Sequence, residues 1–360
     1  MTSLQQENTS VVLHKRDREE KPLCDIVVEN LKVREPADNE VIVRMNSVGI
    51  CGSDVHIWMT SGIGHFMMNG PMVAGHEASG TIEKCGNKVK HLKPGDRVAI
   101  EPGYPLTEDE FSKSGRYNLS EDLFFGSAPP DNGLLQRYYT HRADFCYKLP
   151  DNVSFEEGAL IEPLSVAIHS CRRVGVTLGH RVLVLGSGPI GLVSLLVAKA
   201  YGAASVIVVD ILASRLEKAK ELGANFTLEV KTGEKPQETA RKIKELLGGM
   251  PDRTLECTGS EAGLQTGIYA TKSGGRLAVI GVGESNKTLP IVHAAMREVD
   301  IIGIFRYCNT WPAAINMLAS GQIDVKSLVT HRFPIEKAQE AFEFTRGGKG
   351  IKVMIKCEKD

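Results

Sequence analysis

A glycine-rich turn at residues 186–191, GSGPIG, constrains the fold of this chain more than any other stretch. The apolar run VLVLG leads into it, and IGLVSLLVAKAYG, which has the composition of a buried helix, follows it. A second apolar run, VIVVD, ends at Asp210, about twenty residues further on. This order predicts a strand, a tight turn, a helix and a second strand that bind a dinucleotide, with the pyrophosphate at the helix N-terminus. A glycine turn that only packs a helix on a sheet is the weaker alternative.

The residues after the turn indicate which dinucleotide is bound. The carboxylate of Asp210 would accept hydrogen bonds from the adenosine ribose, and its charge would repel a 2′-phosphate, so NAD is favoured over NADP. Arg215, five residues on, could balance Asp210 or hold a 2′-phosphate, which leaves NADP open as an alternative. We expect the cofactor to contact Gly186, Gly188, Ile190, Gly191, Asp210, Arg215, Ile280, Gly281, Val282, Ile304, Phe305 and Arg306.

The pattern of the sequence changes near residue 175. Before it, alternating or β-branched runs such as EVIVRMNSVGI and GDRVAI are separated by Gly, Asn and Pro, which predicts a β-rich domain. After it, apolar strands alternate with helices, which predicts βαβ units and a doubly wound parallel sheet. Two short helices and a last strand, IKVMIKC, follow residue 306. With 360 residues, 42% of them hydrophobic, we expect an α/β protein of about two domains.

Charge and hydropathy exclude several classes of function. The net charge of −1 and the pI near 6.8 give no general attraction to nucleic acid or to an anionic membrane. No apolar run approaches the ~18 residues that a membrane span needs. The polar N-terminus of mixed charge resembles neither a signal peptide nor a transit peptide. The eight cysteines form no CxxC pair, so we expect mostly free, buried thiols and a cytoplasmic protein.

Four residues in three separate segments could together hold a metal. Cys51 lies in GICGSDVHIW, His76 and Glu77 lie in PMVAGHEASG, and Glu162 lies in EGALIEPLSV. Taken singly, a buried thiol, a core imidazole and an acid at a helix N-terminus are the simpler interpretations. Taken together, a thiolate, an imidazole and carboxylates are the ligand set of a catalytic zinc with an open position. Adjacent residues of a regular strand point to opposite faces, so His76 and Glu77 can share an ion only where the backbone is irregular, as Gly75 would allow.

Several motifs carry a resemblance to a known family. The chain resembles the zinc-containing medium-chain dehydrogenases nearly from end to end, and within them the polyol-oxidising, ketose-forming branch, through GICGSDVH, PMVAGHEASG, KPGDRVAIEPG, EGALIEPLSVAIHSCRR, GSGPIG and IFRYCNTWPAAINMLASG. The resemblance implies a GroES-like β-rich catalytic domain at 1–164, a Rossmann NAD-binding domain at 165–304, and a C-terminal return to the catalytic domain at 305–360.

The resemblance also implies the roles of the metal-site residues. Cys51, His76 and Glu77 would ligate zinc, and Glu162 would hold the zinc-bound water or exchange onto the metal. The implied reaction transfers a hydride from a secondary alcohol of a polyol, of the sorbitol or xylitol type, to C4 of NAD⁺ and yields a ketose.

The released proton must leave a buried site. Ser53 and His56 are spaced so that a hydroxyl and an imidazole could pass it outward, as in the wider family. A turn hydroxyl and a partly exposed surface imidazole are the alternatives.

The substrate pocket follows the polyol branch except at two places. We expect it to be lined by Ser53, Ile57, Ile63, Phe66, Phe125, Glu162, Arg306 and Tyr307. The branch usually has a tyrosine at position 57 and Cys-Ala-Thr at 126–128, whereas this chain has Ile57 and Gly-Ser-Ala ending at Ala128. The pocket has therefore lost a phenol and a hydroxyl, and we expect an altered substrate preference or weaker polyol binding.

The lobe at 101–120, EPGYPLTEDEFSKSGRYNLS, aligns with a segment that holds a structural zinc in many relatives of this family. The four cysteine positions fall on Leu106, Asp109, Ser112 and Ser120, which cannot make a closed thiolate site. We therefore expect one catalytic zinc and no structural zinc, with Phe111 and Tyr117 anchoring the lobe.

Three functions remain for comparison. The first is a zinc- and NAD-dependent polyol dehydrogenase. The second is a dehydrogenase of another secondary alcohol, such as L-threonine or an arabinitol-type polyol, or a paralogue with little polyol activity. The third is a dinucleotide-binding protein without catalysis, which the complete zinc set disfavours because unpaired buried polar groups are costly. From the family we also expect a homo-oligomer, a tetramer.

Overall fold

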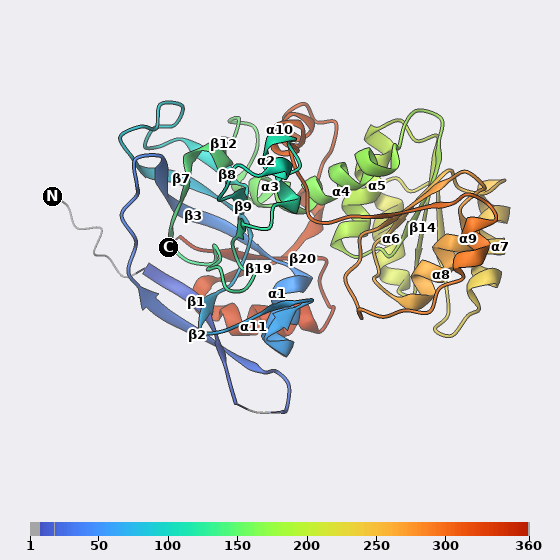
Figure 1. Cartoon of the computed structure of the whole chain (residues 1–360), viewed down its shortest axis with the longest axis horizontal. Coiled ribbons are helices and arrows are strands. Elements are labelled where there is room, and N and C mark those ends of the chain that lie inside the picture. Colours follow the sequence, from blue (N-terminus) through green and yellow to red (C-terminus); the bar gives the residue numbers. More distant parts are fainter. Residues whose placement is uncertain (1–7, 18, 359–360) are drawn as a thin grey trace. The chain divides into compact units, whose positions relative to one another are not determined.

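The computed structural model describes residues 8–17 and 19–358, in which the chain divides into two units. One unit combines the residues up to Glu162 with those from Trp311 onward, and the other is Pro163–Thr310. The C-terminal segment thus returns to the first unit, where Figure 1 shows its red elements beside the blue N-terminal strands.

The first unit is built mainly of strands. Its strands are β1 Asn8–Lys15, β2 Cys24–Leu31, β3 Glu40–Ile50, β4 Gly62–Ile63, β5 Phe66–Met67, β6 Met72–Val73, β7 Glu77–Cys85, β8 Arg97–Ile100, β9 Gly103–Pro105, β10 Leu123–Phe125, β11 Tyr138–Arg142, β12 Cys146–Lys148, β19 Val329–Pro334 and β20 Lys352–Lys356. Its helices are α1 Gly52–Thr60, α2 Glu110–Lys113, α3 Phe155–Ala159, α10 Trp311–Ala319 and α11 Ala338–Arg346. The predicted β-rich domain is confirmed.

Strand β3 is the centre of the largest sheet, whose order is β12-β8-β7-β3-β20-β19 with β11 also paired to β3. Its first half pairs with β11, its second half pairs with β20, and β7 runs antiparallel to it over most of its length. In this register Gly49 lies opposite Glu77, and Ile50 lies opposite Val353. The end of β3, the start of β7 and the start of β20 therefore meet at one place.

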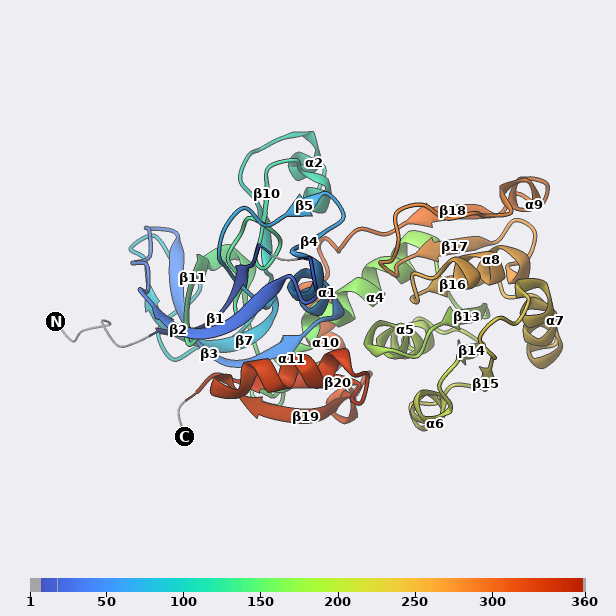
Figure 2. The same cartoon turned by 90° about the horizontal axis from the view of Figure 1, so that it is seen from below.

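The core of the first unit is covered by α1 and α11. Ile57 and Trp58 from α1 and Phe342 from α11 belong to one buried cluster with side chains of β1, β3 and β7. The Trp58 and Phe342 rings meet edge to face, with centroids 6.1 Å apart. Figure 2 shows the two helices next to one another.

The second unit is a parallel sheet with helices between its strands. Helix α4, Ile161–Val174, leads into it, and the elements that follow are β13 Arg181–Leu185, α5 Pro189–Ala200, β14 Ser205–Asp210, α6 Ala213–Glu221, β15 Phe226–Glu229, α7 Pro236–Leu247, β16 Arg253–Glu256, α8 Glu261–Ala270, β17 Arg276–Val279, α9 Ile291–Ala295 and β18 Asp300–Gly303. The strand order is β15-β14-β13-β16-β17-β18, all parallel, as Figure 2 shows. This is the doubly wound dinucleotide-binding order, and the predicted fold class is confirmed.

None of the helices among the described residues combines the length and the apolar character that crossing a membrane requires.

Candidate metal centre

Three of the predicted ligands come together in the first unit. The Cys51 sulfur, a His76 ring nitrogen and a Glu77 carboxylate oxygen all lie within 4.8 Å of one another. His76 is 6% exposed and Glu77 is completely buried. Glu162, in the first turn of α4, is also buried, at 6% exposure. Cys51 is half-buried. A thiol, an imidazole and a carboxylate together are a donor set that zinc prefers.

The backbone around these residues explains how neighbours can share one site. Strand β7 begins at Glu77, so His76 lies just outside it, and Gly75 has a left-handed φ of +88°. The predicted irregularity at Gly75 is confirmed. On the neighbouring strand β3, position 49 also requires glycine, because a Cβ there would lie 2.2 Å from Glu77 Oε2. Only glycine at 49 leaves room for this carboxylate.

Asp54 ties the two ligand-bearing segments together. It is completely buried on the first turn of α1, and its carboxylate accepts hydrogen bonds from the backbone N–H groups of Cys51 (3.0 Å) and Gly75 (3.2 Å). The Ser127 hydroxyl donates to it at 2.8 Å, and His76 Nδ1 lies 3.2 Å from it. A carboxylate on Nδ1 fixes the tautomer and the ring orientation of a metal-binding histidine, and leaves Nε2 for the metal.

The charge of these groups is reflected in the pKa of His76. Burial by itself lowers the pKa of this imidazole, but the Asp54 carboxylate and the Cys51 sulfur outweigh it, so that the pKa is raised well above its ordinary value. A site that favours a positive charge on this ring is also one that favours a cation beside it.

A buried lysine completes the cluster. Lys352, at the start of β20, donates from Nζ to both Glu77 oxygens at 2.7 Å and to the Ile50 carbonyl at 3.3 Å. Lys352 is 2% exposed. Burial lowers the pKa of its ammonium group, but the charges of the nearby Glu77, Cys51 and Glu162 raise it by more than burial lowers it. The pKa of Lys352 is therefore above its ordinary value. The cation therefore neutralises part of the negative charge that the acids and the thiolate bring to the site.

Ser53 and Phe125 lie beside the cluster. The Ser53 hydroxyl is 3.4 Å from His76 Nε2, and the Phe125 and His76 rings have centroids 5.9 Å apart. His56 follows Ser53 by one turn of α1 and is exposed. A hydroxyl at the cluster and an imidazole at the surface are thus present on the same helix.

The other residues expected in the substrate pocket lie in different surroundings. Ile57 is 1% exposed and belongs to the hydrophobic core, while Ile63 and Phe66 pair across the short β4–β5 hairpin. Arg306 and Tyr307 belong to the second unit: Tyr307 is 2% exposed, and Arg306 stacks over the Phe305 ring with its Cζ 4.7 Å from the centroid. Ala128 is 7% exposed. The substrate contacts of these residues stay a prediction.

The glycine turn has the local geometry that the sequence predicts. Gly186 has φ of +94°, Gly188 is the N-cap of α5, and a Cβ at Gly191 would lie 1.8 Å from the Gly186 carbonyl oxygen. Asp210, at the end of β14, accepts hydrogen bonds from the Ser187 N–H and hydroxyl through Oδ2. Arg215 lies near Gly188. The acid therefore also holds the turn.

The remaining residues assigned to the cofactor lie on the neighbouring strand ends of the same sheet. Ile280, Gly281 and Val282 follow β17, and Ile304 and Phe305 follow β18. Ile190 is half-buried near the start of α5, whereas Val282 is 70% exposed and Phe305 is 42% exposed. Ligands of open parallel sheets bind outside the carboxyl ends of the strands, where these residues are.

The lobe at 101–120 is held by a buried carboxylate. Glu101 is completely buried and accepts hydrogen bonds from the phenols of Tyr117 (2.6 Å) and Tyr147 (2.9 Å). Burial raises its pKa to about 7, against the effect of both hydrogen bonds. The prediction that Tyr117 anchors the lobe is confirmed, while the Phe111 side chain is half-buried. Asp109 caps α2 by accepting from the Ser112 N–H at 2.7 Å.

Sequence reasoning missed Asp54, Ser127 and Lys352. An acid three residues after the helix N-cap Cys51 is a capping signal that could have marked Asp54. A lysine inside the apolar run IKVMIKC could have marked Lys352, because a buried lysine needs an acidic partner. Ser127 carries no such signal, since its contact depends on the fold of a loop.

Comparisons with known proteins agree with this arrangement. Residues 37–151 match the family model "Alcohol dehydrogenase GroES-like domain", and residues 189–320 match "Zinc-binding dehydrogenase". The chain is 64% identical to sorbitol dehydrogenase of Homo sapiens over 334 residues, 93% of each chain. It is 61% identical to sorbitol dehydrogenase of Bos taurus over 358 residues, 99% of this chain and 98% of that one.

A solved structure has the same fold over nearly the whole length. It is an oxidoreductase/dehydrogenase of unknown specificity from Escherichia coli, described as involved in membrane biogenesis. The match has a TM-score of 0.90 and 32% identity, and covers 98% of this chain and all of that one.

Proposed function

Since the chain belongs to the zinc-binding dehydrogenase family and is an oxidoreductase of the sorbitol dehydrogenase (L-iditol 2-dehydrogenase) type, we propose that Cys51, His76 and Glu77 hold the zinc at which it oxidises a polyol to a ketose. The observation that carries this assignment is the grouping of the three donor atoms within 4.8 Å. Zinc at this site would lower the pKa of a bound hydroxyl and stabilise negative charge on its oxygen. The glycine turn and Asp210 would hold NAD, which would supply the hydride acceptor.

The chain's own residues would prepare and protect this step. Asp54 orients His76, and Lys352 holds Glu77 while offsetting its charge. Glu162, buried near Lys352, would hold water or exchange onto the metal. Ser53 would accept the proton of the substrate hydroxyl, and the exposed His56 would pass it to solvent.

Cofactor choice would rest on Asp210. Its carboxylate, fixed by Ser187 and by the Leu212 N–H at 2.9 Å, would accept the ribose hydroxyls and disfavour a 2′-phosphate. The supporting observation is that the carboxylate is held at the end of β14, beside the glycine turn.

The substrate pocket would favour a modified set of polyols. We propose that Ile63, Phe66 and Phe125 contact the substrate, with Ile57 and Ala128 as apolar positions. Both of these residues are buried and carry no hydrogen-bonding side chain. A dehydrogenase of another secondary alcohol is therefore the second candidate, because a pocket with fewer polar groups discriminates less in favour of hydroxyl-rich substrates.

Two features of the chain support a proposal for its assembly and its location. We propose a cytoplasmic homotetramer, with functional domains at 1–164, 165–304 and 305–360. Strand β18 is an edge of the parallel sheet, and Ile301 on it is 38% exposed, which suits pairing with a second copy. The eight free cysteines suit a reducing compartment.

Metal analysis combined with NADH absorbance on a panel of polyols tests this function. We expect one zinc per chain, turnover of sorbitol or xylitol, and loss of both zinc and turnover in Cys51→Ala, with NADH binding kept. Zinc with turnover only of other alcohols would favour the second candidate. An active Cys51→Ala protein without zinc would disprove the assignment of the site.

A further inference from the structure

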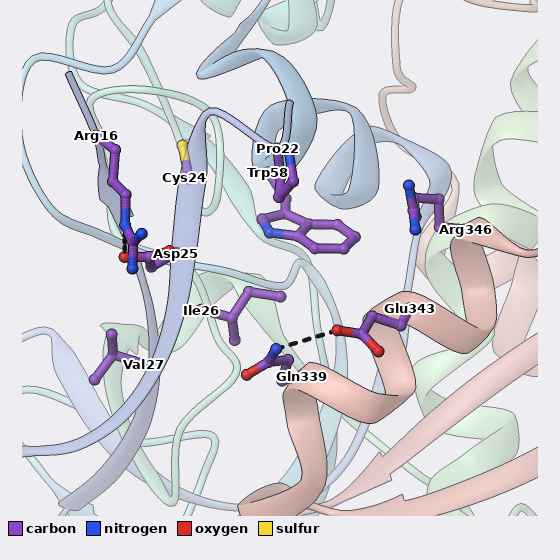
Figure 3. Close-up of a pocket in the computed structure, with 10 residues that line it drawn as sticks. All are labelled: Arg16, Pro22, Cys24, Asp25, Ile26, Val27, Trp58, Gln339, Glu343 and Arg346. Carbon is purple, nitrogen blue, oxygen red and sulfur yellow. Dashed lines mark hydrogen bonds and ion pairs between the residues drawn. The ribbon is translucent and has the colours of Figure 1, made fainter. Parts of the chain in front are cut away.

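A cavity of about 430 Å³ lies in the first unit, and Figure 3 labels the ten residues that line it. They come from the segment around β2, from α1 and from α11, and none of Cys51, His76, Glu77 or Glu162 is among them. The volume falls within the range of small-molecule sites.

An indole ring lines this cavity. Trp58 is 4% exposed and is one of the lining residues. In Figure 3 the indole occupies the middle of the lining, with its nitrogen on the edge turned toward the side of Arg16 and Asp25. The indole N–H is a hydrogen-bond donor, and a hydroxyl oxygen of a ligand can accept from it.

Planar polar side chains surround the indole. Arg16 pairs with Asp25, Gln339 donates to Glu343 at 3.1 Å, and Arg346 lies over the indole with its Cζ 5.7 Å from the ring centroid. Two guanidinium groups and two carboxylates give a formal sum of zero, so the cavity does not select for an anion or a cation. The lining offers both donors and acceptors, and each hydroxyl of a polyol can both donate and accept.

Apolar surface completes the lining. Ile26 and Pro22 stand next to Trp58, so an aliphatic face would have an apolar wall while its hydroxyl groups reach the polar rim. A neutral molecule with hydroxyl groups along a carbon chain satisfies both parts of the lining.

We propose that this cavity binds a neutral polyhydroxylated small molecule, a sugar or polyol, at a site separate from the metal cluster. Helix α1 connects the two sites. Its N-cap is Cys51 and its first turn carries Asp54, while Trp58 near its other end lines the cavity. Occupancy of the cavity therefore bears on the helix that positions a metal-site residue. The site does not rest on the assignment of the catalytic residues.

Tryptophan fluorescence tests the proposal. The chain has two tryptophans, and Trp311 is completely buried, so Trp311→Phe leaves Trp58 as the only reporter. We expect sorbitol or fructose to change the Trp58 emission saturably, with a Kd on the order of 1 mM. Equilibrium dialysis of the unmodified holoenzyme with labelled sorbitol gives a second readout, and we expect two binding sites per chain.

The control variants separate this cavity from the catalytic site. Gln339→Ala combined with Arg346→Ala should weaken the fluorescence response at least about tenfold, or about 1.4 kcal/mol, and remove one site in dialysis, while kcat/KM for the polyol stays within about twofold. Glu340→Ala, on the same helix but outside the lining, should change neither. A single site per chain, no saturable response, or a response unchanged by the double variant would overturn the proposal.

Discussion

The buried Lys352–Glu77 pair makes a prediction that separates metal binding from folding. Lys352→Met keeps most of the side-chain volume but removes the ammonium group that donates to both Glu77 oxygens at 2.7 Å. The two side chains are 2% and 0% exposed, so water cannot replace the lost cation. Removing one member of a buried ion pair costs about 3–5 kcal/mol, and we expect this loss in the free energy of unfolding of the metal-free protein.

Zinc should recover part of that loss. A divalent cation at the cluster supplies a positive charge beside Glu77, and in the variant no lysine competes with it for the Glu77 oxygens. The zinc-loaded variant should therefore be destabilised less than the metal-free variant. If the two losses differ by about 1.4 kcal/mol, linkage requires that the variant bind zinc about tenfold more tightly than the unmodified protein. We therefore expect higher zinc affinity together with lower stability.

Urea unfolding of both forms and zinc titration against a competing chelator measure these quantities. Lys356→Met, on the same strand, is the matched control: Lys356 pairs with Glu156 at 2.7 Å but is 40% exposed, so its loss should cost no more than about 1 kcal/mol. The double variant Lys352→Met/Glu77→Gln removes the unpaired charge and should regain most of the stability of the metal-free protein. Equal destabilisation of both forms, or weaker zinc binding by Lys352→Met, would refute the reasoning.

Three further predictions concern other parts of the molecule. Burial raises the pKa of Glu101 from 4.5 to about 7, so its contribution to stability is complete below pH 4.5 and declines as the pH rises through 7. The difference in unfolding free energy between wild type and Glu101→Gln should therefore fall by about 3 kcal/mol over this pH range. A difference that does not change with pH would contradict this prediction. Asp210→Ser should shift the ratio of kcat/KM toward NADP, and an unchanged ratio would remove Asp210 from cofactor selection. Ile57→Tyr should raise kcat/KM for sorbitol at a cost of about 1–3 kcal/mol in stability, since Ile57 is 1% exposed; destabilisation without a gain in kcat/KM would place this residue in the core only.

The sequence predicts most of the fold because local patterns determine it. The glycine turn, the parallel strands of the second unit and the last strand are each marked by residues that lie close together in the sequence. The structure confirms all three elements. Helix α1 is less evident, because GSDVHIWMT is short and contains β-branched and aromatic residues that form helices only moderately well. Its formation depends on the packing of Trp58 against α11.

The metal site is predictable only in part, because some of its residues are brought together by long-range pairing of strands. Residue type marks Cys51, His76 and Glu77, because their side chains carry the chemistry of a metal ligand. Lys352 is 275 residues from Glu77, and only the pairing of β20 with β3 brings them together. The identity of a supporting residue depends on such long-range register, which residue type does not reveal.

The pairing of β20 with β3 also has a consequence for the order of events during synthesis. The ribosome makes Cys51, His76 and Glu77 early, then the whole parallel-sheet unit, and only afterwards the strand that carries Lys352. Until then Glu77 lacks its ammonium partner and β3 has an open edge where β20 will pair. Synthesis of the first unit thus begins before that of the second unit and ends after it. Before β20 is made, the nascent chain has an incomplete sheet in the first unit, with the acidic metal site at the end of β3.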